Sequence, residues 1–230
     1  MQLIPMVEVT DKEELSLALK AIRPCACTAE TCLIDDWPTF EFKEEADLFK
    51  MAGDYRKREF NAGRKCLRGA LEKFDVVRLP IPSDCHGVPI FPEGYLGCIS
   101  HSRGLCAAIA GKKNDFRALG LDLEMTNRLS ASAIDRTVHP IEETYVKGDQ
   151  VRASLIFCAK EAFFKAQFPL WHTHANFRDV AFRVDAENQS LHIEWMDKRY
   201  PEALRALAGE IYFNYRYFGA FVVTICWIAA

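Results

Sequence analysis

The chain has 230 residues, of which 50% are hydrophobic and 27% charged, which excludes a disordered segment and allows a sizeable core. Its net charge of -3 argues against a general nucleic-acid binder, although local basic patches remain compatible with it. The odd count of 9 cysteines, several of them inside apolar runs, fits a reducing cytosol better than a secreted disulfide scaffold. No second Cys or His pair at zinc-site spacing follows Cys25, Cys27 and Cys32, so we expect no zinc there.

The two ends of the chain carry no membrane or export signal. The N-terminal stretch MQLIPMVEVTDKEE lacks a basic start followed by an apolar core, so we expect no signal peptide. The longest apolar run is GAFVVTICWIAA at the C-terminus, which is too short to span a bilayer and predicts a final buried strand. We therefore expect a cytoplasmic protein without a membrane span.

The first half of the chain predicts a helix followed by a small sheet. Apolar residues recur at helical spacing from Glu41 to about Phe74, with cations between them. Four prolines then mark an extended passage that neither a helix nor a central strand tolerates: Pro80, Pro82, Pro89 and Pro92. The segments YLGCIS and LCAAIAG predict two short strands joined by a turn at residues 101–104, and LGLDLEM predicts a further strand.

The second half predicts two helices and then a run of strands. A short helix is expected from Ser130, as its cap, to Val138. The strongest helical segment begins at Gln150, and we expect Pro169 to stop it after Phe168. The segments AFRVD, SLHIEWM, EIYFNYRYF and AFVVTICW predict antiparallel strands. These elements predict an α+β protein of two similar-sized lobes, residues 1–114 and 115–230.

The strand ALGLDLEM places two carboxylates side by side. Its leucines alternate with Asp122 and Glu124, so both acids lie on one face, roughly 7 Å apart along the strand. Two readings stay open at this point. The acids form a solvated outer face, as in many strands, or they hold a shared cation.

The long helix contains CAKEAFFKA, in which Glu161 and Lys165 are one turn apart on the same face. Lys160 is rotated about 100° from Glu161. An ordinary surface ion pair is one interpretation. The residues around the motif are apolar nearly all round, however, which indicates a mostly buried helix whose charges need partners, and this favours a functional site.

The first helical segment is rich in cations, among them Arg56 and Arg64. Such a cluster suits bidentate binding of phosphate, and a solvated basic face is the alternative. His101 lies at a strand end, and Ser100 beside it points to the opposite face, so the two are not a nucleophile and its base. The chain has no GxSxG, P-loop or GxGxxG motif.

Four motifs in chain order resemble one family: RKREFNAGRKCLRGAL, GVPIFPEGYLGCISHS, LGLDLE and FCAKEAFFKA. Together they are similar to the 4′-phosphopantetheinyl transferases of the larger, monomeric type, especially the enterobactin-synthetase component D subgroup. The resemblance runs from about Arg56 to Ala166, roughly half of the chain. It implies two α/β lobes related by a pseudo-two-fold, each with a small, mostly antiparallel sheet packed on a long helix.

The resemblance also implies a reaction and roles for residues. Phosphopantetheine would pass from coenzyme A to a serine of an apo acyl, peptidyl or aryl carrier protein in siderophore or secondary-metabolite biosynthesis, leaving adenosine 3′,5′-bisphosphate. The implied ligands of Mg²⁺ are three acids: Asp122, Glu124 and Glu161. By the same resemblance Glu161 would deprotonate the serine, directly or through water, and Lys165 would stabilise charge on the pyrophosphate. The remaining implied coenzyme A contacts are Arg56, Arg64, His101 and Lys160. A monomer is expected, without nucleic-acid partners.

One departure and two alternatives accompany this expectation. Members of the family often carry a basic residue where this chain has Ser83 and Asp84, so one phosphate contact is either missing or supplied elsewhere. The first alternative is a protein that binds coenzyme A or a carrier protein without turnover. The second is a different metal-dependent phosphoryl or nucleotidyl enzyme that uses the same acids.

Overall fold

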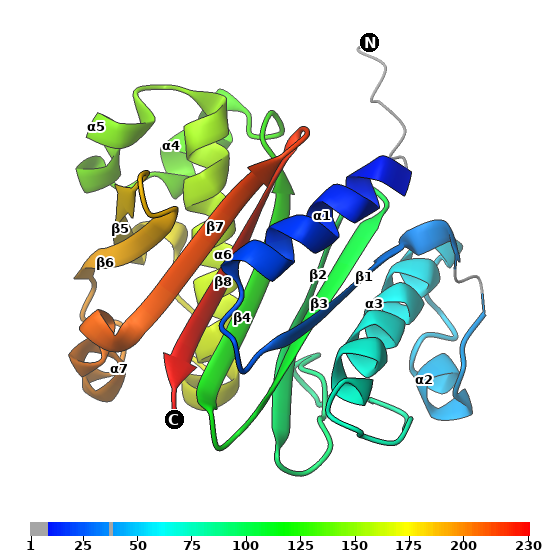
Figure 1. Cartoon of the computed structure of the whole chain (residues 1–230). Helices are drawn as coiled ribbons and strands as arrows, with labels where there is room; N and C mark the ends of the chain where they lie inside the picture. The colour runs from blue at the N-terminus through cyan, green and yellow to red at the C-terminus, as the bar shows by residue number, and fades with distance from the viewer. Residues whose placement is uncertain (1–8, 37–38) are drawn as a thin grey trace.

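The computed structural model describes residues 9–36 and 39–230 (Figure 1). Residues 1–8, which belong to the stretch in which a signal peptide was sought, lie outside the described residues. The α-helices are α1 (Val9–Ile22), α2 (Lys43–Leu48), α3 (Asp54–Glu72), α4 (Ala131–Thr137), α5 (Glu143–Val146), α6 (Gln150–Trp171) and α7 (Glu202–Ala206). The strands are β1 (Thr28–Leu33), β2 (Tyr95–Ser102), β3 (Leu105–Lys112), β4 (Phe116–Met125), β5 (Val180–Asp185), β6 (Ser190–Met196), β7 (Ile211–Phe218) and β8 (Phe221–Ala229).

The strands form two antiparallel sheets. The first has three strands in the order β1-β3-β2, and the second has five in the order β4-β8-β7-β6-β5. Strands β2 and β4 run beside each other where the sheets meet, and there Leu123 donates its backbone N–H to the Ser100 hydroxyl at 3.2 Å. This seam brings a strand end of the first half against the acidic strand of the second.

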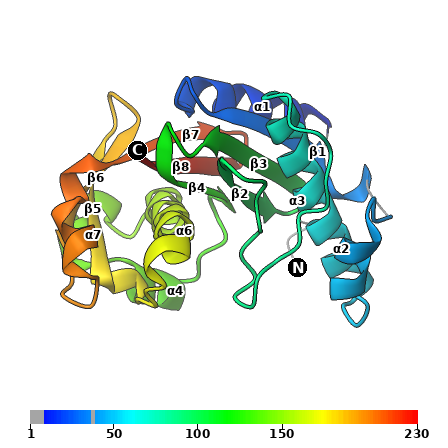
Figure 2. The same ribbon diagram turned by 90° about the horizontal axis from the view of Figure 1, so that it is seen from below.

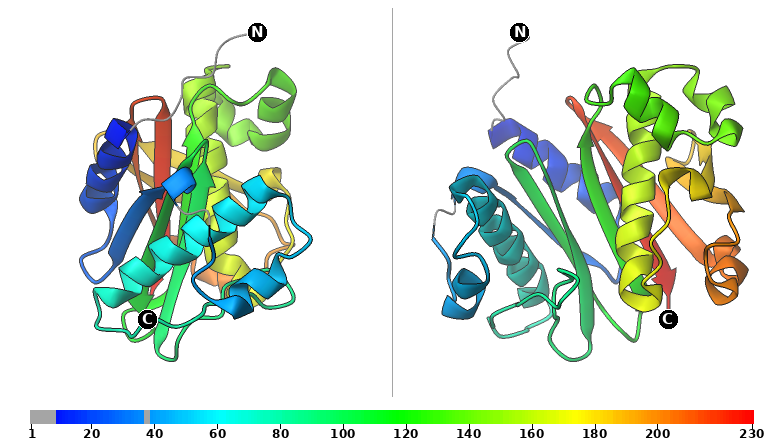
Figure 3. Two further views of the ribbon diagram at one scale, coloured as in Figure 1. Left: turned by 90° about the vertical axis from the view of Figure 1, so that its right-hand side faces the viewer. Right: turned by 180° about the vertical axis from the view of Figure 1, so that it is seen from behind.

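Helices cover the two sheets on both sides. Viewed from below, α1 lies on one side of the sheets, and α3 and α6 lie on the other (Figure 2). Figure 3 shows α3 packed on the three-stranded sheet and α6 packed on the five-stranded sheet, with β2 and β4 between the two helices. The two long helices therefore face the same side of the molecule and flank the seam.

Close packing fixes α6 against β4. Gly120 of β4 has no side chain where one would collide with the helix, because an added Cβ would lie 2.0 Å from the carbonyl oxygen of Ala162. One apolar core belongs to the second half, a smaller one lies under α3, and a third joins α1 to strands of both sheets. The shared core includes Leu15 and Leu19 of α1 together with Leu121 of β4. The acidic strand is thus held from both sides.

Two predicted helices differ from the sequence-based expectation, and some elements were not predicted. The helix predicted from Glu41 to Phe74 is two helices, α2 and α3, because the chain turns at residues 49–53 and Gly53 caps α3 in an extended conformation. Helix α6 continues through Pro169 to Trp171 and ends at His172, whose φ of 49° lies in the left-handed region. A proline this close to the C-terminal end of a helix removes only one hydrogen bond. Helix α1 and strand β1 were not predicted.

The other predicted elements are present in the structure, which also contains the unpredicted short helices α5 and α7. The hairpin of β2 and β3 turns at Arg103 and Gly104, and both residues have positive φ, as a two-residue hairpin turn requires. Ser130 caps α4 by accepting a hydrogen bond from the backbone N–H of Ala133 at 3.2 Å. The four C-terminal segments form β5 to β8. The chain therefore has a mixed α/β fold with two sheets, and none of the helices in the described part is long and apolar enough to cross a membrane.

Candidate functional site

A cavity of about 740 Å³ opens between the two halves of the chain. Its walls come from α3, the passage before β2, the end of β2, strand β4 and helix α6. Seven of the eight residues expected at a site line it: Arg56, Arg64, His101, Asp122, Glu124, Glu161 and Lys165. Asp122, Glu124 and Glu161 lie on the side of β4 and α6, and we call this the acidic side. Arg56 and Arg64 come from α3, together with Glu59, and we call this the basic side.

Asp122 is the most constrained residue of the acidic side. One of its oxygens, Oδ1, lies 2.6 Å from the Lys165 ammonium and accepts a hydrogen bond from the Ser100 hydroxyl at 2.9 Å. Lys165 also donates to Ser100 at 3.1 Å and to the carbonyl oxygen of Leu121 at 3.2 Å. Burial alone would lower the pKa of Lys165, but Asp122 outweighs it and raises the pKa above the usual range. Lys165 therefore keeps its proton beside Asp122.

The second oxygen of Asp122 lacks a hydrogen-bond partner although it is buried. A buried, unpartnered carboxylate oxygen costs free energy unless a ligand satisfies it. Burial raises the pKa of Glu124 to about 7, and the charge of Asp122 adds to that rise. The same two causes raise the pKa of Glu161. A cation bound between Asp122 and these two carboxylates would offset the effect of the Asp122 charge on them.

These acids suit a hard divalent ion, which prefers oxygen ligands. Their oxygens do not form a compact cluster: within the described part of the chain, the one group of three potential metal-ligating side chains whose ligand atoms lie within 4.8 Å of one another consists of cysteines. An ion held by these acids would need further ligands, and Mg²⁺ commonly takes waters and substrate phosphates in that role.

The basic side contains a small network around His101. Arg56 donates to Nε2 of His101 at 3.3 Å and to the Glu59 carboxylate at 3.1 Å. The other ring nitrogen, Nδ1, lies 3.2 Å from the second oxygen of Glu59. Burial lowers the pKa of His101 and so favours the neutral ring, although Glu59 acts in the opposite direction. Glu59 thus orients both a guanidinium and an imidazole at the cavity wall.

Arg64 is a buried residue of α3 that also lines the cavity. Its guanidinium donates to the carbonyl oxygen of Ile81 at 2.6 Å and to the Ser83 hydroxyl at 2.7 Å, and it lies over the Phe60 ring. Burial lowers its pKa to about 10. Ser83 is where a basic residue was expected, and here it receives a hydrogen bond from Arg64. The buried arginine therefore brings positive charge to that part of the wall.

Lys160 is the one expected site residue that does not line this cavity. Its ammonium is buried, 2.7 Å from Glu142 and 2.8 Å from the carbonyl oxygen of Thr137. Glu142 in turn accepts hydrogen bonds from the backbone of His139 and Phe182, both at 2.8 Å. Lys160 instead borders a neighbouring cavity of about 260 Å³, which shares Glu161 with the large one.

Sequence reasoning missed several residues that the structure brings to the site. Ser100 was noted only as a poor nucleophile, yet it bridges Asp122 and Lys165. Glu59 was not singled out because a single acid among cations is typical of any helix surface. Phe164 and His174 line both cavities, and no local pattern indicates that.

Comparison with known proteins finds matches on both sides of residue 115. A model of the 4′-phosphopantetheinyl transferase N-terminal domain matches residues 44–111, and a model of the 4′-phosphopantetheinyl transferase superfamily matches residues 118–226. The 4′-phosphopantetheinyl transferase PptT of Mycobacterium tuberculosis is 32% identical over 149 residues, covering 62% of this chain and 66% of PptT.

Two further relatives show similar agreement. The 4′-phosphopantetheinyl transferase Npt of Nocardia iowensis is 31% identical over 64% of this chain and 67% of Npt. Enterobactin synthase component D of Salmonella typhimurium is 29% identical over 52% of each chain. The alignments with PptT and Npt thus span about two thirds of the length of each relative.

Proposed function

The chain belongs to the 4′-phosphopantetheinyl transferase superfamily, and we propose that it transfers the 4′-phosphopantetheine group of coenzyme A to a serine of an apo carrier protein. The products would be the holo carrier and adenosine 3′,5′-bisphosphate. One observation carries the proposal: a single cavity combines the unpartnered oxygen of buried Asp122 with two further carboxylates and with cations from the other half of the chain. Such a site can hold a pyrophosphate between a metal ion and arginines.

Mg²⁺ is the proposed metal. Asp122, Glu124 and Glu161 are the residues that would hold it, and the unpartnered oxygen of Asp122 is the strongest support for that assignment. Bound there, the ion would neutralise charge on the pyrophosphate of coenzyme A. The set of three acids also disfavours a binding protein without turnover, because binding of coenzyme A alone does not require three acids beside its phosphates.

The side chains of the cavity have separate proposed roles. Glu161 would accept the serine proton, directly or through water, and its raised pKa brings it closer to the range in which a general base works best. Lys165 would stabilise the charge that develops on the leaving phosphate. Arg56, Arg64 and His101 would bind the phosphates of coenzyme A, and Glu59 would orient Arg56 and His101.

Lys160 is proposed as a positioning residue. A contact with coenzyme A would require its ammonium to leave Glu142 and Thr137, with which it is already paired in a buried setting. We therefore propose that Lys160 fixes the turn of α6 that carries Glu161.

We also propose the division into lobes at residues 114 and 115, with a pseudo-two-fold between them. Support comes from the matching arrangement of α3 on one sheet and α6 on the other. The family matches end and begin on either side of that point, at residues 111 and 118. A monomer in the cytoplasm and a carrier protein of a siderophore or secondary-metabolite pathway remain proposals of the same kind.

The test is intact-protein mass spectrometry of an apo carrier protein incubated with this protein, coenzyme A and Mg²⁺. We expect a mass gain of one phosphopantetheine, which EDTA abolishes and excess Mg²⁺ restores. Glu161→Gln is the matched control, because it keeps the shape of the side chain and removes its charge. No gain with acyl, peptidyl or aryl carriers, from protein shown to bind coenzyme A, would support the binding protein without turnover. Turnover of small phosphorylated substrates without a carrier would support the other metal-dependent enzyme.

A further inference from the structure

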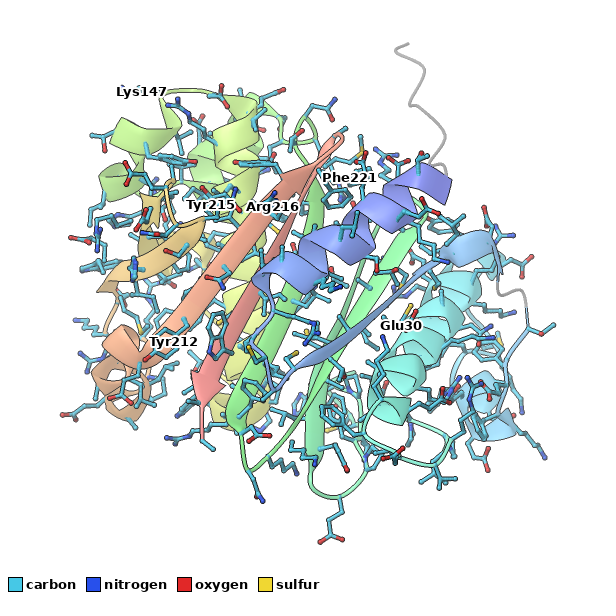
Figure 4. All side chains as sticks on the ribbon, in the orientation of Figure 1. Glu30, Lys147, Tyr212, Tyr215, Arg216 and Phe221 are labelled. Carbon is cyan, nitrogen blue, oxygen red and sulfur yellow. The ribbon has the colours of Figure 1, made fainter. Side chains whose placement is uncertain are left out.

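Three buried cysteines meet beneath α3, away from the acidic residues. Cys32 lies on β1, Cys66 on α3 and Cys106 on β3, and their sulfur atoms all lie within 4.8 Å of one another. The cluster is nearly inaccessible, with Cys32 7%, Cys66 1% and Cys106 0% exposed. Figure 4 labels Glu30, two residues before Cys32 on β1, close to α3, where Lys73 at the end of the helix pairs with it at 2.9 Å.

The fold itself creates this cluster. Cys32 and Cys106 are direct partners in the antiparallel pairing of β1 and β3, so their side chains share one face of the sheet. Cys66 approaches that face from α3, and its sulfur lies 3.1 Å from the sulfur of Cys32. The three positions are 34 and 40 residues apart in sequence, a spacing that no short metal-binding motif shows.

The number and type of donors restrict what this cluster can bind. Thiolates favour soft ions. A thiolate-bound ion holds its sulfurs about 2.3 Å away, so three sulfurs around it lie roughly 3.5–4 Å apart, within the spread seen here. Across residues 9–36 and 39–230, no fourth His, Cys, Asp or Glu joins the group. Structural zinc sites use four protein ligands, so zinc fits poorly.

The net charge of an ion together with three thiolates distinguishes the remaining candidate ions. The cluster belongs to an apolar core that includes Ala62, Leu67 and Ala108. The charged groups that act on its sulfurs are Glu59, Arg64 and Lys65, of both signs. Monovalent copper or divalent zinc on three thiolates would leave a net negative charge buried there, at a large cost. A trivalent ion on three thiolates is neutral. We propose that Cys32, Cys66 and Cys106 form a binding site for a trivalent thiophilic metalloid, for which arsenite is the probe.

The binding step balances without an oxidant or reductant. Arsenous acid, As(OH)₃, reacts with three thiols to give one As(S-Cys)₃ group and three water molecules. Three S–H and three As–O bonds break, three As–S and three O–H bonds form, and arsenic stays trivalent. The neutral reagent meets neutral thiols, so no ion has to enter the core. Binding would link β1, β3 and α3 covalently, and the linked helix is the one that carries Arg56 and Arg64.

The experiment uses the full chain with its two exposed cysteines, Cys25 and Cys85, changed to serine so that they do not compete. This protein is incubated with sodium arsenite and phosphine reductant, both in its native state and during refolding from urea, and free arsenite is then removed. We expect one arsenic per chain by intact mass, three sulfur neighbours by arsenic X-ray absorption, and a melting temperature raised by about 5–10 °C, the scale for a cross-link closing loops of this length.

Two variants locate the site. Cys66→Ala should lose the arsenic, whereas Cys158→Ala, which removes a buried cysteine from the other long helix, should keep it. The X-ray absorption measurement needs no variant and so does not depend on whether Cys66→Ala folds. A chain that takes up no arsenic in either incubation, or that binds it through only one or two sulfurs, would overturn the proposal.

Discussion

Two lysines of α6, five positions apart, form ion pairs of nearly equal length in different surroundings. Lys165 lies 2.6 Å from Asp122, and Lys160 lies 2.7 Å from Glu142. The Lys165 side chain is 28% exposed and lines the large cavity, whereas the Lys160 side chain is 1% exposed. We call Lys165 with Asp122 the open pair and Lys160 with Glu142 the sealed pair. Geometry of the pair alone therefore does not distinguish a site from a structural contact.

The hydrogen bonds of the two carboxylates, Glu142 and Asp122, distinguish the two ion pairs. Both oxygens of Glu142 are occupied, one by Phe182 and the other by Lys160 and His139. One oxygen of Asp122 is occupied, and the other is buried without a partner. The fold completes the hydrogen bonds of Glu142, whereas Asp122, which lines the large cavity, keeps one buried oxygen open. The open position supports the proposal that the acidic side of the cavity binds a ligand.

The largest expected effect comes from Asp122→Asn. The change removes the charge at the open position and keeps the shape, so we expect transfer to fall by at least about 100-fold, the scale of losing one electrostatic contact in an active site. Initial rates of holo-carrier formation measure it. Thermal unfolding provides the control, because a folded variant should retain a cooperative transition. Near-normal turnover of this variant would contradict the role assigned to Asp122.

Lys160→Met tests the sealed pair. Removing the lysine leaves Glu142 buried without its cation, which typically costs about 3–5 kcal/mol of unfolding free energy. We expect this loss in urea unfolding, while the folded fraction binds coenzyme A with unchanged affinity. The opposite result, unchanged stability with weaker coenzyme A binding, would return Lys160 to the phosphate ligands.

A double variant separates the pair from the packing of Lys160. In Glu142→Gln combined with Lys160→Met, neither partner is charged, and glutamine can still accept one backbone hydrogen bond. We expect the double variant to be more stable than the sum of the two single changes predicts. Additive losses would mean that the two side chains contribute independently.

Ser100→Ala should have an intermediate effect. Its hydroxyl donates to Asp122 and accepts from Lys165 and from the backbone of Leu123, so it holds the open pair in place across the seam. We expect about 1–3 kcal/mol lower stability and a turnover several-fold lower. The matched control is Ser102→Ala on the same strand face. Ser102 is also buried, but its hydroxyl has no hydrogen-bond partner in the structure, so its loss should be nearly neutral.

Sequence patterns predicted local relations of Asp122 and of Lys165, but neither their ion pair nor the pair of Lys160 with Glu142. The period of two placed Asp122 and Glu124 on one strand face, and the helical period placed Glu161 one turn from Lys165. Both relations are local. The partner of Lys160 is Glu142, which lies on a short 3₁₀ helix (Pro140–Glu142) and reaches α6 only after the chain has folded. A lysine in an apolar helix predicts that a partner exists, but not which residue it is.

The same limit applies to the fold. Strand alternation, the hairpin turn and the cap at Ser130 are encoded by neighbouring residues, and they were predicted. The break at Gly53 was not, because the apolar spacing continues across it in sequence while the chain turns at residues 49–53. Helix α1 was missed because its apolar residues pack against strands nearly two hundred positions away, where Asn214 donates to the carbonyl oxygen of Ile22 at 2.9 Å.

The smallest expected effect concerns Arg128, which lies 3.2 Å from Glu124 at the rim of the open pair and is 56% exposed. An exposed ion pair contributes about 0–1 kcal/mol, so Arg128→Ala should hardly change stability. The arginine nevertheless competes with any cation for the same carboxylate, so the variant should need less Mg²⁺ for half-maximal rate, by roughly two-fold. High salt should remove the difference, because it screens an exposed charge.

Arg183→Ala, from the exposed pair with Glu194, is the control and should leave the Mg²⁺ dependence unchanged. A higher Mg²⁺ requirement in Arg128→Ala would instead show that the arginine helps to hold Glu124 in its ligand position.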